Sequence, residues 1–347
     1  MRISVIIPTL NESAYLPRLL QALREQTRPP DEVIVADAGS KDNTVSLALE
    51  WGAKVVSGGM PAVGRNAGAR HAQGEILLFL DADVVPGPFF LERTLSEMKE
   101  RGLEVATCLY QPLEEDSLYP LLTELANLYL LIMAPISPHA PGFCIFAHRW
   151  LHEQIGGFDE SLVMAEDHDY VRRAARLGRF GILRHERLYV SMRRLEKEGL
   201  IGLGLKYLWC EMHALAGRPI HSIPFRYEFG AFSAQTRQRI LGEAYRFSHR
   251  FGHLENPLFA LSQQAREALR LLANEENPEQ LLDRLRQAFT IREIETLRKY
   301  IRKRFVLAFH PRFWRYRWPH WRYQLRRPFH KLEQFWSRRP HKNHHQE

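Results

Sequence analysis

The first 110 residues alternate between short apolar runs and segments with helical periodicity. The runs that predict strands are 3–7, 32–36, 53–57 and 75–80. Between the first two, Leu16, Leu19, Leu20 and Leu23 recur at the i, i+3, i+4, i+7 spacing of one helix face. Further helices are expected up to Trp51, from the "GRNAGARHA" segment (64–72), and from Phe89 to Glu100. Continuous apolar strands that alternate with helices predict an α/β fold with a mostly parallel sheet flanked by helices.

Polar clusters follow three of these four strands. They read "PTLNES" (8–13), "DAGSKDNT" (37–44) and "DAD" (81–83). In parallel sheets, ligands bind beyond the carboxyl ends of the strands. We therefore expect the three clusters to converge on one rim of the sheet and to form a ligand site there.

The remainder of the chain is expected to divide into two parts. Residues 103–230 are less regular and contain "PGF" (141–143), "GGFDE" (156–160) and "AEDHDYVRRAARLG" (165–178). The last of these predicts a helix whose acidic first turn suits the positive end of the helix dipole. From residue 255 to 309 the pattern is helical, and an Arg- and aromatic-rich tail follows. The expected organisation is a domain over 1–230 and a helical, basic extension over 231–347.

The "DAD" cluster has two interpretations. Two carboxylates one residue apart at a strand end can hold a hard divalent cation such as Mg²⁺ or Mn²⁺, together with waters and phosphate oxygens. Such an ion would neutralise charge on a departing diphosphate. The alternative is an ordinary strand-to-turn sequence, because Asp favours turns.

Five ordered motifs favour the first interpretation. "VIIPTLNES", "VIVADAGSKDNT", "GRNAGARHAQGEILLFLDADVVP", "GGFDE" and "AEDHDYVRRAARLG" together resemble family 2 glycosyltransferases, which have the GT-A fold. The resemblance covers residues 1–215. It implies an inverting transferase that uses a nucleotide diphosphate sugar and Mn²⁺ or Mg²⁺, with a nucleotide-sugar-binding half over 1–110 and an acceptor-binding half over 111–230.

The resemblance also implies roles for residues in the first half. Asp81 and Asp83 would be the D-x-D metal ligands, with Asp83 the more direct one. The residues that would bind the nucleotide sugar are Pro8, Thr9, Asn11, Glu12, Asp37, Arg65, Asn66 and Asp81. The family commonly has D-D-G-S where this chain has Asp37-Ala38-Gly39-Ser40, so a uridine donor does not follow. Asn11 and Asp42 have the alternative role of loop caps.

In the second half, Asp167 matches the family's catalytic aspartate. An inverting transfer needs a base that deprotonates the acceptor hydroxyl as it attacks. Glu166 is counted with Asp167 as catalytic, and Asp169 as a neighbour that shapes the site; the alternative is a stabilised acidic helix start. Arg193 and Arg194, in "SMRRLEKEG" (191–199), resemble an Arg-Arg segment that grips the diphosphate. They could equally belong to a solvated helix face.

Composition bears on where the protein is located in the cell and on what its basic tail binds. Three widely spaced cysteines fit a reducing cytosol, and the first residues read as a strand rather than a signal peptide. The apolar stretch 118–136 is interrupted by polar residues and is too short in its clean part for the roughly 20 residues of a membrane-spanning helix. Of the 48 Lys and Arg residues, 15 lie from residue 298 onward, against two acidic residues.

This tail carries a net charge of +13, whereas residues 1–297 carry −5. Residues 298–340 therefore predict peripheral binding to an anionic membrane, on the inner face of the cell membrane. A solvated tail and a protein partner are alternatives, and nucleic acid is the least favoured because no recognition motif accompanies the tail.

The function expected is transfer of a single sugar from a nucleotide diphosphate sugar to an acceptor hydroxyl. The sequence does not identify the acceptor; one interpretation is a lipid-linked or membrane-proximal one. The chain lacks a clear Q-x-x-R-W signature of processive synthases. Two rivals are a nucleotide-sugar-binding protein without transferase activity and a sugar-phosphate nucleotidylyltransferase. The second class usually has a G-G-x-G-x-R loop after the first strand, where this chain has "PTLNES".

Overall fold

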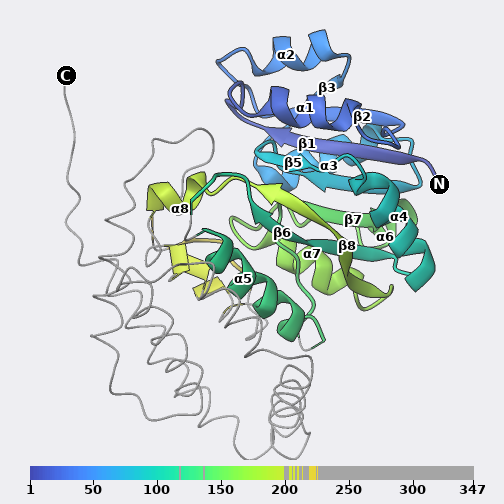
Figure 1. Ribbon diagram of the computed structural model, residues 1–347, viewed down its shortest axis with the longest axis vertical. Helices are drawn as coiled ribbons and strands as arrows, with labels where there is room; N and C mark the ends of the chain where they lie inside the picture. Colours follow the sequence, from blue (N-terminus) through green and yellow to red (C-terminus); the bar gives the residue numbers. More distant parts are fainter. Residues whose placement is uncertain are drawn as a thin grey trace, which may run out of the picture.

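The computed structural model describes residues 1–116, 119–135 and 137–198, and shorter pieces at 203–204, 206–207, 209–210, 213, 219–223 and 225. Within them, one eight-stranded sheet is flanked by helices (Figure 1). The expected helical extension over 231–347 and its basic tail lie outside the described residues.

The strands are β1 (Ile3–Thr9), β2 (Glu32–Asp37), β3 (Lys54–Ser57), β4 (Ile76–Leu80), β5 (Val84–Pro86), β6 (Val105–Pro112), β7 (Cys144–His148) and β8 (Phe180–Val190). The helices are α1 (Leu16–Arg24), α2 (Thr44–Trp51), α3 (Pro61–His71), α4 (Phe90–Arg101), α5 (Tyr119–Met133), α6 (Arg149–Gln154), α7 (Glu166–Ala174) and α8 (Arg193–Glu198). All four strands expected in the first 110 residues are present. The third helix begins at Pro61, three residues before the expected start, because proline is well suited to the first helical turn.

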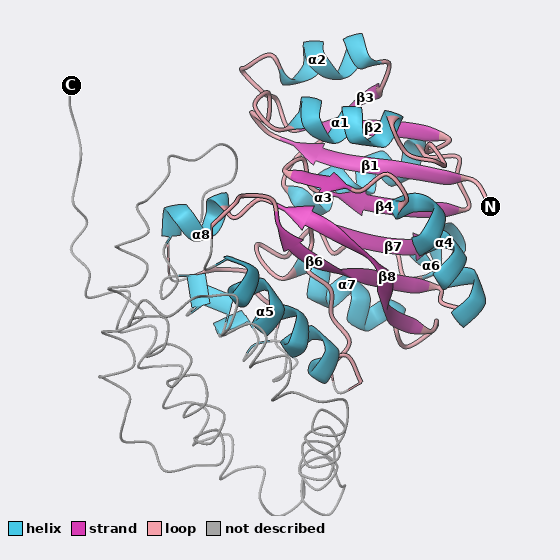
Figure 2. Ribbon diagram, viewed as in Figure 1, coloured by secondary structure: helices cyan, strands magenta, loops and turns pink. Residues whose placement is uncertain are grey.

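The sheet order is β3-β2-β1-β4-β7-β6-β8-β5 (Figure 2). Strands β3, β2, β1 and β4 are mutually parallel, whereas β7 runs antiparallel to β4 and β6, and β5 antiparallel to β8. Since β6 and β8 are parallel, parallel pairings outnumber antiparallel ones by four to three. The expected α/β fold with a mostly parallel sheet is confirmed.

Helices cover both faces of the sheet. One apolar cluster joins α1, α2 and α4 to the sheet, and the leucines at the predicted helical spacing in α1 are all fully buried there. A second cluster joins α3, α6 and α7 to the opposite face. Burying one stripe of each helix against a sheet face is what gives this three-layer arrangement its core.

Helix α3 packs very closely on β1. A Cβ built on Gly68 would lie 2.3 Å from Cγ2 of Ile6, so only glycine fits at this helix position. Strand β1 in turn lies between β2 and β4, with Thr9 in register with Asp37. The close packing fixes α3, and with it Arg65, against the strand ends that carry the polar clusters.

Helix α5 contains most of the apolar stretch considered above as a membrane span. It has 15 residues and packs against β6. In the part of the chain that the structure describes, no helix combines the length and the apolar character needed to cross a bilayer.

Candidate active site

The loops after β1 and β2 are joined by hydrogen bonds. The hydroxyl of Thr9 donates to Oδ1 of Asp37 (3.0 Å), and Oδ2 of Asp37 accepts from the backbone N–H groups of Gly39 and Ser40 at 2.9 and 2.8 Å. The Ser40 hydroxyl also donates to Oδ1. The Asp37 carboxylate thus organises the turn that follows β2, and both of its oxygens are engaged there.

Asn11 ties the same two loops together from the other side. Its side-chain oxygen accepts from the backbone N–H of Lys41 at 2.8 Å, and its own N–H donates to the Ser40 hydroxyl at 2.8 Å. Asn11 has φ of +54°, a conformation that asparagine tolerates better than most residues. These contacts match the loop-cap role that the sequence left open for Asn11.

Glu12 and Asp83 meet at the guanidinium of Arg193. Both terminal nitrogens of Arg193 donate to the two Glu12 oxygens, at 2.8 and 2.9 Å, while its Nε donates to Oδ2 of Asp83 at 2.7 Å. The guanidinium lies 4.4 Å from the ring centre of Tyr15, a cation–π distance. The first residue of α8 therefore brings the ends of β1 and β4 together.

Burial shapes the charges of this group. Burial raises the pKa of Glu12, against the lowering effect of Arg193, and the neighbouring carboxylates Asp83 and Asp81 raise it further. The pKa of Asp83 is raised in the same way, chiefly by burial. Burial disfavours the charge of Arg193, but its contacts with the two acids outweigh this, so its pKa lies above the ordinary value. The two carboxylates are held in a place where a cation is strongly favoured.

Arg65, on α3, forms a second junction. Its side chain is 3% exposed; one terminal nitrogen donates to Glu166 at 2.7 Å, and the other to Asp81 at 3.1 Å and to the carbonyl oxygen of Gly142 at 3.0 Å. Burial disfavours its charge, but the carboxylates of Asp81, Glu166 and Asp167 raise its pKa overall. Arg65 connects the D-x-D strand end to the first turn of α7.

Asp167 lies in this first turn of α7. Burial is the main cause of its raised pKa, which Arg65 and a hydrogen bond from the Gly142 backbone partly offset. Ala165, the residue before the first residue of α7, has φ of +59°, a conformation unusual for alanine, and turns the chain into the helix. Glu166 also has a raised pKa, caused first by burial and then by the Asp167 charge. Asp169 faces elsewhere and pairs with Arg172 and Arg173.

Asn66 serves the loop before α7 rather than the strand ends. Its amide nitrogen donates to the carbonyl of Phe158 (2.8 Å) and to Glu160 (2.9 Å), and its oxygen accepts from the Phe158 N–H at 2.8 Å. Gly157 has φ of +72°, and a Cβ there would lie 2.5 Å from the Asn66 oxygen. The "GGFDE" segment is thus fastened to α3 by one buried amide.

The described residues contain no cluster of three or more His, Cys, Asp or Glu side chains arranged to hold a metal ion. The donor set still fits a hard cation that takes one or two carboxylates and completes its shell with waters and phosphate oxygens. The side chain of Asp81 is 35% exposed. Burial raises the pKa of Asp83, so a positive partner is required to stabilise its charged form.

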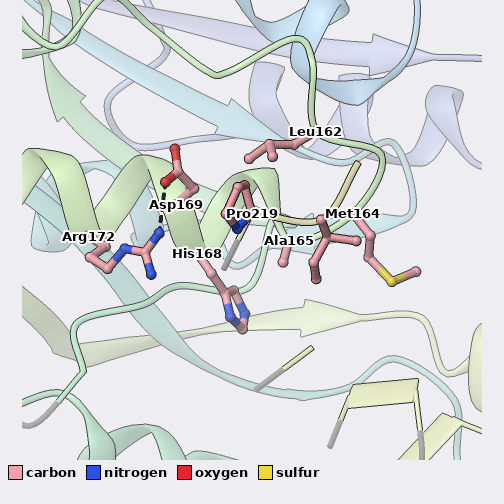
Figure 3. A pocket seen from close by; sticks show the side chains of 8 residues that line it. Leu162, Met164, Ala165, His168, Asp169, Arg172 and Pro219 are labelled. Atoms are coloured by element: carbon pink, nitrogen blue, oxygen red, sulfur yellow. Dashed lines mark hydrogen bonds and ion pairs between the residues drawn. The ribbon is translucent and has the colours of Figure 1, made fainter. Parts of the chain in front are cut away.

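A small cavity lies on the other side of α7 (Figure 3). It has a volume of about 20 Å³ and is lined by Leu162, Met164, Ala165, His168, Asp169, Arg172, Pro219 and Ile220. This is room for about one water molecule. In Figure 3 Asp169 lies beside Arg172 and is paired with it. The cavity is too small for a sugar to enter.

The structure brings together most residues singled out from the sequence. Two adjoining groups form around two arginines: Glu12 and Asp83 around Arg193, and Asp81 with the Glu166–Asp167 pair around Arg65. The neighbouring loops are built by Thr9, Asn11 and Asp37, and Pro8 lies close to α3. Arg194 acts on Asp83 through its charge. Asn66 points away, towards the 158–160 loop.

Two contributors were not predicted from the sequence. Tyr15 supplies the ring beneath Arg193, and Gly142 supplies a carbonyl to Arg65. A Cβ on Gly142 would lie 2.8 Å from Nη2 of Arg65 and 3.0 Å from Oδ2 of Asp167, so a side chain there would disturb both groups. The "PGF" motif was the available signal for Gly142, whereas nothing near Tyr15 distinguishes it from other helix-start residues.

Comparison with known proteins shows which family part of the chain resembles. Residues 4–154 match the sequence model of the family described as "Glycosyl transferase family 2". The O-antigen chain rhamnosyltransferase RfbN of Salmonella typhimurium is 29% identical over 192 residues, which cover 48% of this chain and 59% of that protein. The 4,4'-diaponeurosporenoate glycosyltransferase of Staphylococcus haemolyticus is 42% identical over 91 residues, 24% of each chain. The chain spans less than two thirds of the length of these relatives.

Among solved structures, the mannosyltransferase PcManGT from Pyrobaculum calidifontis, in complex with GDP-Man and Mn²⁺, is 18% identical with a TM-score of 0.48, over 97% of this chain and 85% of that one. TarS 1–349 of S. aureus, in complex with UDP-GlcNAc, is 22% identical with a TM-score of 0.47, over 62% and 66%. The match to the model of glycosyl transferase family 2 spans residues 4–154, the segment that carries the D-x-D strand and Arg65.

Proposed function

We propose that the chain is an inverting glycosyltransferase that moves a single sugar from a nucleotide diphosphate sugar to an acceptor hydroxyl. The observation that carries the proposal is the Arg65 junction, where one buried guanidinium binds both Asp81 and Glu166. It holds Asp81, one of the two carboxylates expected to serve the leaving diphosphate, beside the helix turn expected to serve the attack. The match of residues 4–154 to the family 2 model supports the same reaction class.

In this reaction Asp167 is the general base. Its carboxylate takes the proton of the acceptor hydroxyl while the acceptor oxygen bonds to the anomeric carbon from the face opposite the diphosphate. The bond from that carbon to the diphosphate oxygen breaks, and its electron pair leaves with the nucleotide diphosphate. A base whose pKa is raised by burial accepts a proton more readily near neutral pH, and such a group contributes about 10²–10⁴-fold.

The donor is proposed to lie across the rim, with its nucleotide near the loops that Thr9, Asn11 and Asp37 organise. Asp81 and Asp83 would hold Mn²⁺ or Mg²⁺, which when bound supplies positive charge to the diphosphate. Arg193 and Arg194 supply further positive charge from the start of α8, and guanidinium groups match phosphate oxygens with two parallel hydrogen bonds. Solved structures with this general likeness include complexes with GDP-Man and Mn²⁺ and with UDP-GlcNAc.

The acceptor is proposed to be lipid-linked or presented near a membrane, with the chain held at the inner face of the cell membrane through residues 298–340. The net charge of +13 from residue 298 onward and the aromatic residues among these cations support membrane binding. Full-length protein should sediment with anionic vesicles and not with neutral ones, and salt should release it. Equal binding to both vesicle types would contradict this part of the proposal.

A donor screen tests the reaction itself. Release of nucleoside diphosphate is measured with UDP-Glc, UDP-GlcNAc and GDP-Man, each with Mn²⁺ and with a chelator. We expect at least one donor to be turned over only with metal. Asp83→Ala should abolish this turnover, whereas Asp159→Ala, which removes a loop carboxylate that accepts hydrogen bonds from Ser161, should retain it. Metal-independent turnover by the Asp83 variant would refute the assignment.

A further inference from the structure

Arg193 occupies the carboxylates that the proposed function gives to the metal and the donor. Its guanidinium forms a two-pronged pair with Glu12 and a third bond to Asp83, with all three distances between 2.7 and 2.9 Å. The Arg193 side chain is only 12% exposed, and the Tyr15 ring covers one of its faces. An internal cation therefore neutralises the two buried acids.

A divalent cation at Asp83 and the Arg193 guanidinium compete for the same negative charge. Two cations at one buried carboxylate repel each other, and the repulsion is strong where water is excluded. Removal of Arg193 from Glu12 and Asp83 without a substitute would leave both acids uncompensated. Metal alone therefore has to displace three charge-assisted hydrogen bonds.

A nucleotide diphosphate offers Arg193 an alternative partner of matching geometry. Its phosphate oxygens accept from the guanidinium as carboxylate oxygens do, and metal at Asp83 can bridge to the same diphosphate. The backbone before Arg193 is held in place: the Ser191 hydroxyl and the Met192 N–H both donate to Glu114, at 2.6 and 2.8 Å. Transfer of Arg193 from the acids to the diphosphate then needs only side-chain rotation.

We propose that Arg193 is an internal counter-ion that keeps metal off Asp83 until a nucleotide diphosphate arrives and takes its guanidinium. Metal and donor then bind together rather than one by one. This inference rests on the proposed function, because it uses the same metal and diphosphate. It adds an order of binding and makes Arg193 an inhibitory contact in the ligand-free chain.

The test is Mn²⁺ binding by the full-length protein, followed by the electron paramagnetic resonance signal of free Mn²⁺, with and without UDP or GDP. The wild-type protein should bind Mn²⁺ weakly alone and much more tightly with nucleotide. Arg193→Gln should bind Mn²⁺ alone on the order of 10-fold to 100-fold more tightly than wild type, the range that loss of a charge-assisted contact gives. Arg93→Gln, which removes the exposed Arg93–Glu186 pair, is the matched control and should behave as wild type.

Tyr15→Leu provides a second variant that keeps every charge. It removes the ring beneath Arg193 and should tighten Mn²⁺ binding by a few-fold, in the same direction as the arginine variant. Equal Mn²⁺ affinity in wild type, Arg193→Gln and Tyr15→Leu would overturn the inference while nucleotide-dependent metal binding still supports the proposed function. If no protein binds Mn²⁺ even with nucleotide, both fail.

Discussion

Arg65 gives the most informative single substitution for the architecture of the site. Arg65→Met keeps most of the side-chain volume and removes the guanidinium that neutralises Glu166 and Asp81. Removing one partner of a buried ion pair costs about 3–5 kcal/mol because the other charge stays buried without compensation. Glu166 is 15% exposed and carries most of this cost, whereas Asp81, at 35%, is partly solvated.

The loss of stability should depend on pH in a defined direction. The pKa of Glu166 is already raised by burial, and without Arg65 it rises further. A carboxyl whose folded pKa exceeds its unfolded pKa destabilises the folded state once pH rises above the unfolded value, near 4.3. The difference between variant and wild type should therefore be small near pH 4 and grow towards pH 8.

Urea denaturation followed by far-UV circular dichroism, at pH 5 and pH 8, measures this difference. Arg70→Met is the matched control on the same helix, because Arg70 is 63% exposed and its pair with Glu160 is long, at 3.8 Å. Exposed pairs of this kind contribute at most about 1 kcal/mol. If Arg65→Met cost no more than Arg70→Met, or cost the same at both pH values, Arg65 would not be the junction described above.

Three further predictions follow from close contacts and burial. Gly142→Ala should slow nucleoside diphosphate release markedly, because its Cβ would lie 2.8 Å from Nη2 of Arg65 and 3.0 Å from a carboxylate oxygen of Asp167. Unchanged turnover would contradict this. Gly68→Ala should lower the free energy of unfolding by about 1–3 kcal/mol, since its Cβ would lie 2.3 Å from Ile6. An unchanged melting temperature in calorimetry would refute this prediction. Burial lowers the pKa of His152 to about 4, so on acidification its imidazole is protonated in the unfolded chain before it is protonated in the folded chain. The free energy of unfolding should therefore fall by roughly 3 kcal/mol as pH drops from about 6.5 to 4. In His152→Phe this decrease should be smaller, and an identical pH dependence of unfolding in the two proteins would count against it.

The first half of the fold could be predicted from the sequence because its central strands β1, β2 and β4 are buried on both faces. Strands β1, β2 and β4 are continuous apolar runs, and the polar residues at their ends mark where the strands leave the core. The convergence of these ends on one rim follows from parallel pairing alone. The Thr9–Asp37 and Glu12–Arg193–Asp83 contacts confirm that the three clusters meet.

The second half was harder to predict because local pattern and long-range pairing diverge there. Strand β8 has buried residues near its two ends and exposed or half-buried charged ones in its middle, so it lacks the apolar signature of the central strands. Strand β7 runs antiparallel beside β4 although it lies more than sixty residues later in the sequence. Sequence periodicity gives no information about such a pairing.

The roles of the two arginines show the same limit at the level of side chains. Motif matching selected Arg65 and Arg193 as nucleotide-binding residues, but which carboxylates each one contacts depends on how α3 and α8 dock on the sheet. Asn66, adjacent to Arg65, has a quite different position because successive helix residues face different directions.

The assignment of Asp167 as the base is tested most directly by one substitution. Asp167→Asn keeps the size of the side chain and the hydrogen bond that its oxygen accepts from the His168 N–H, but removes the proton acceptor. With a donor that wild type turns over, the rate of nucleoside diphosphate release and the affinity for that donor with Mn²⁺ are measured on both proteins. Release should be slowed about 10²–10⁴-fold in the variant, with donor affinity unchanged. Turnover near the wild-type rate would contradict the assignment.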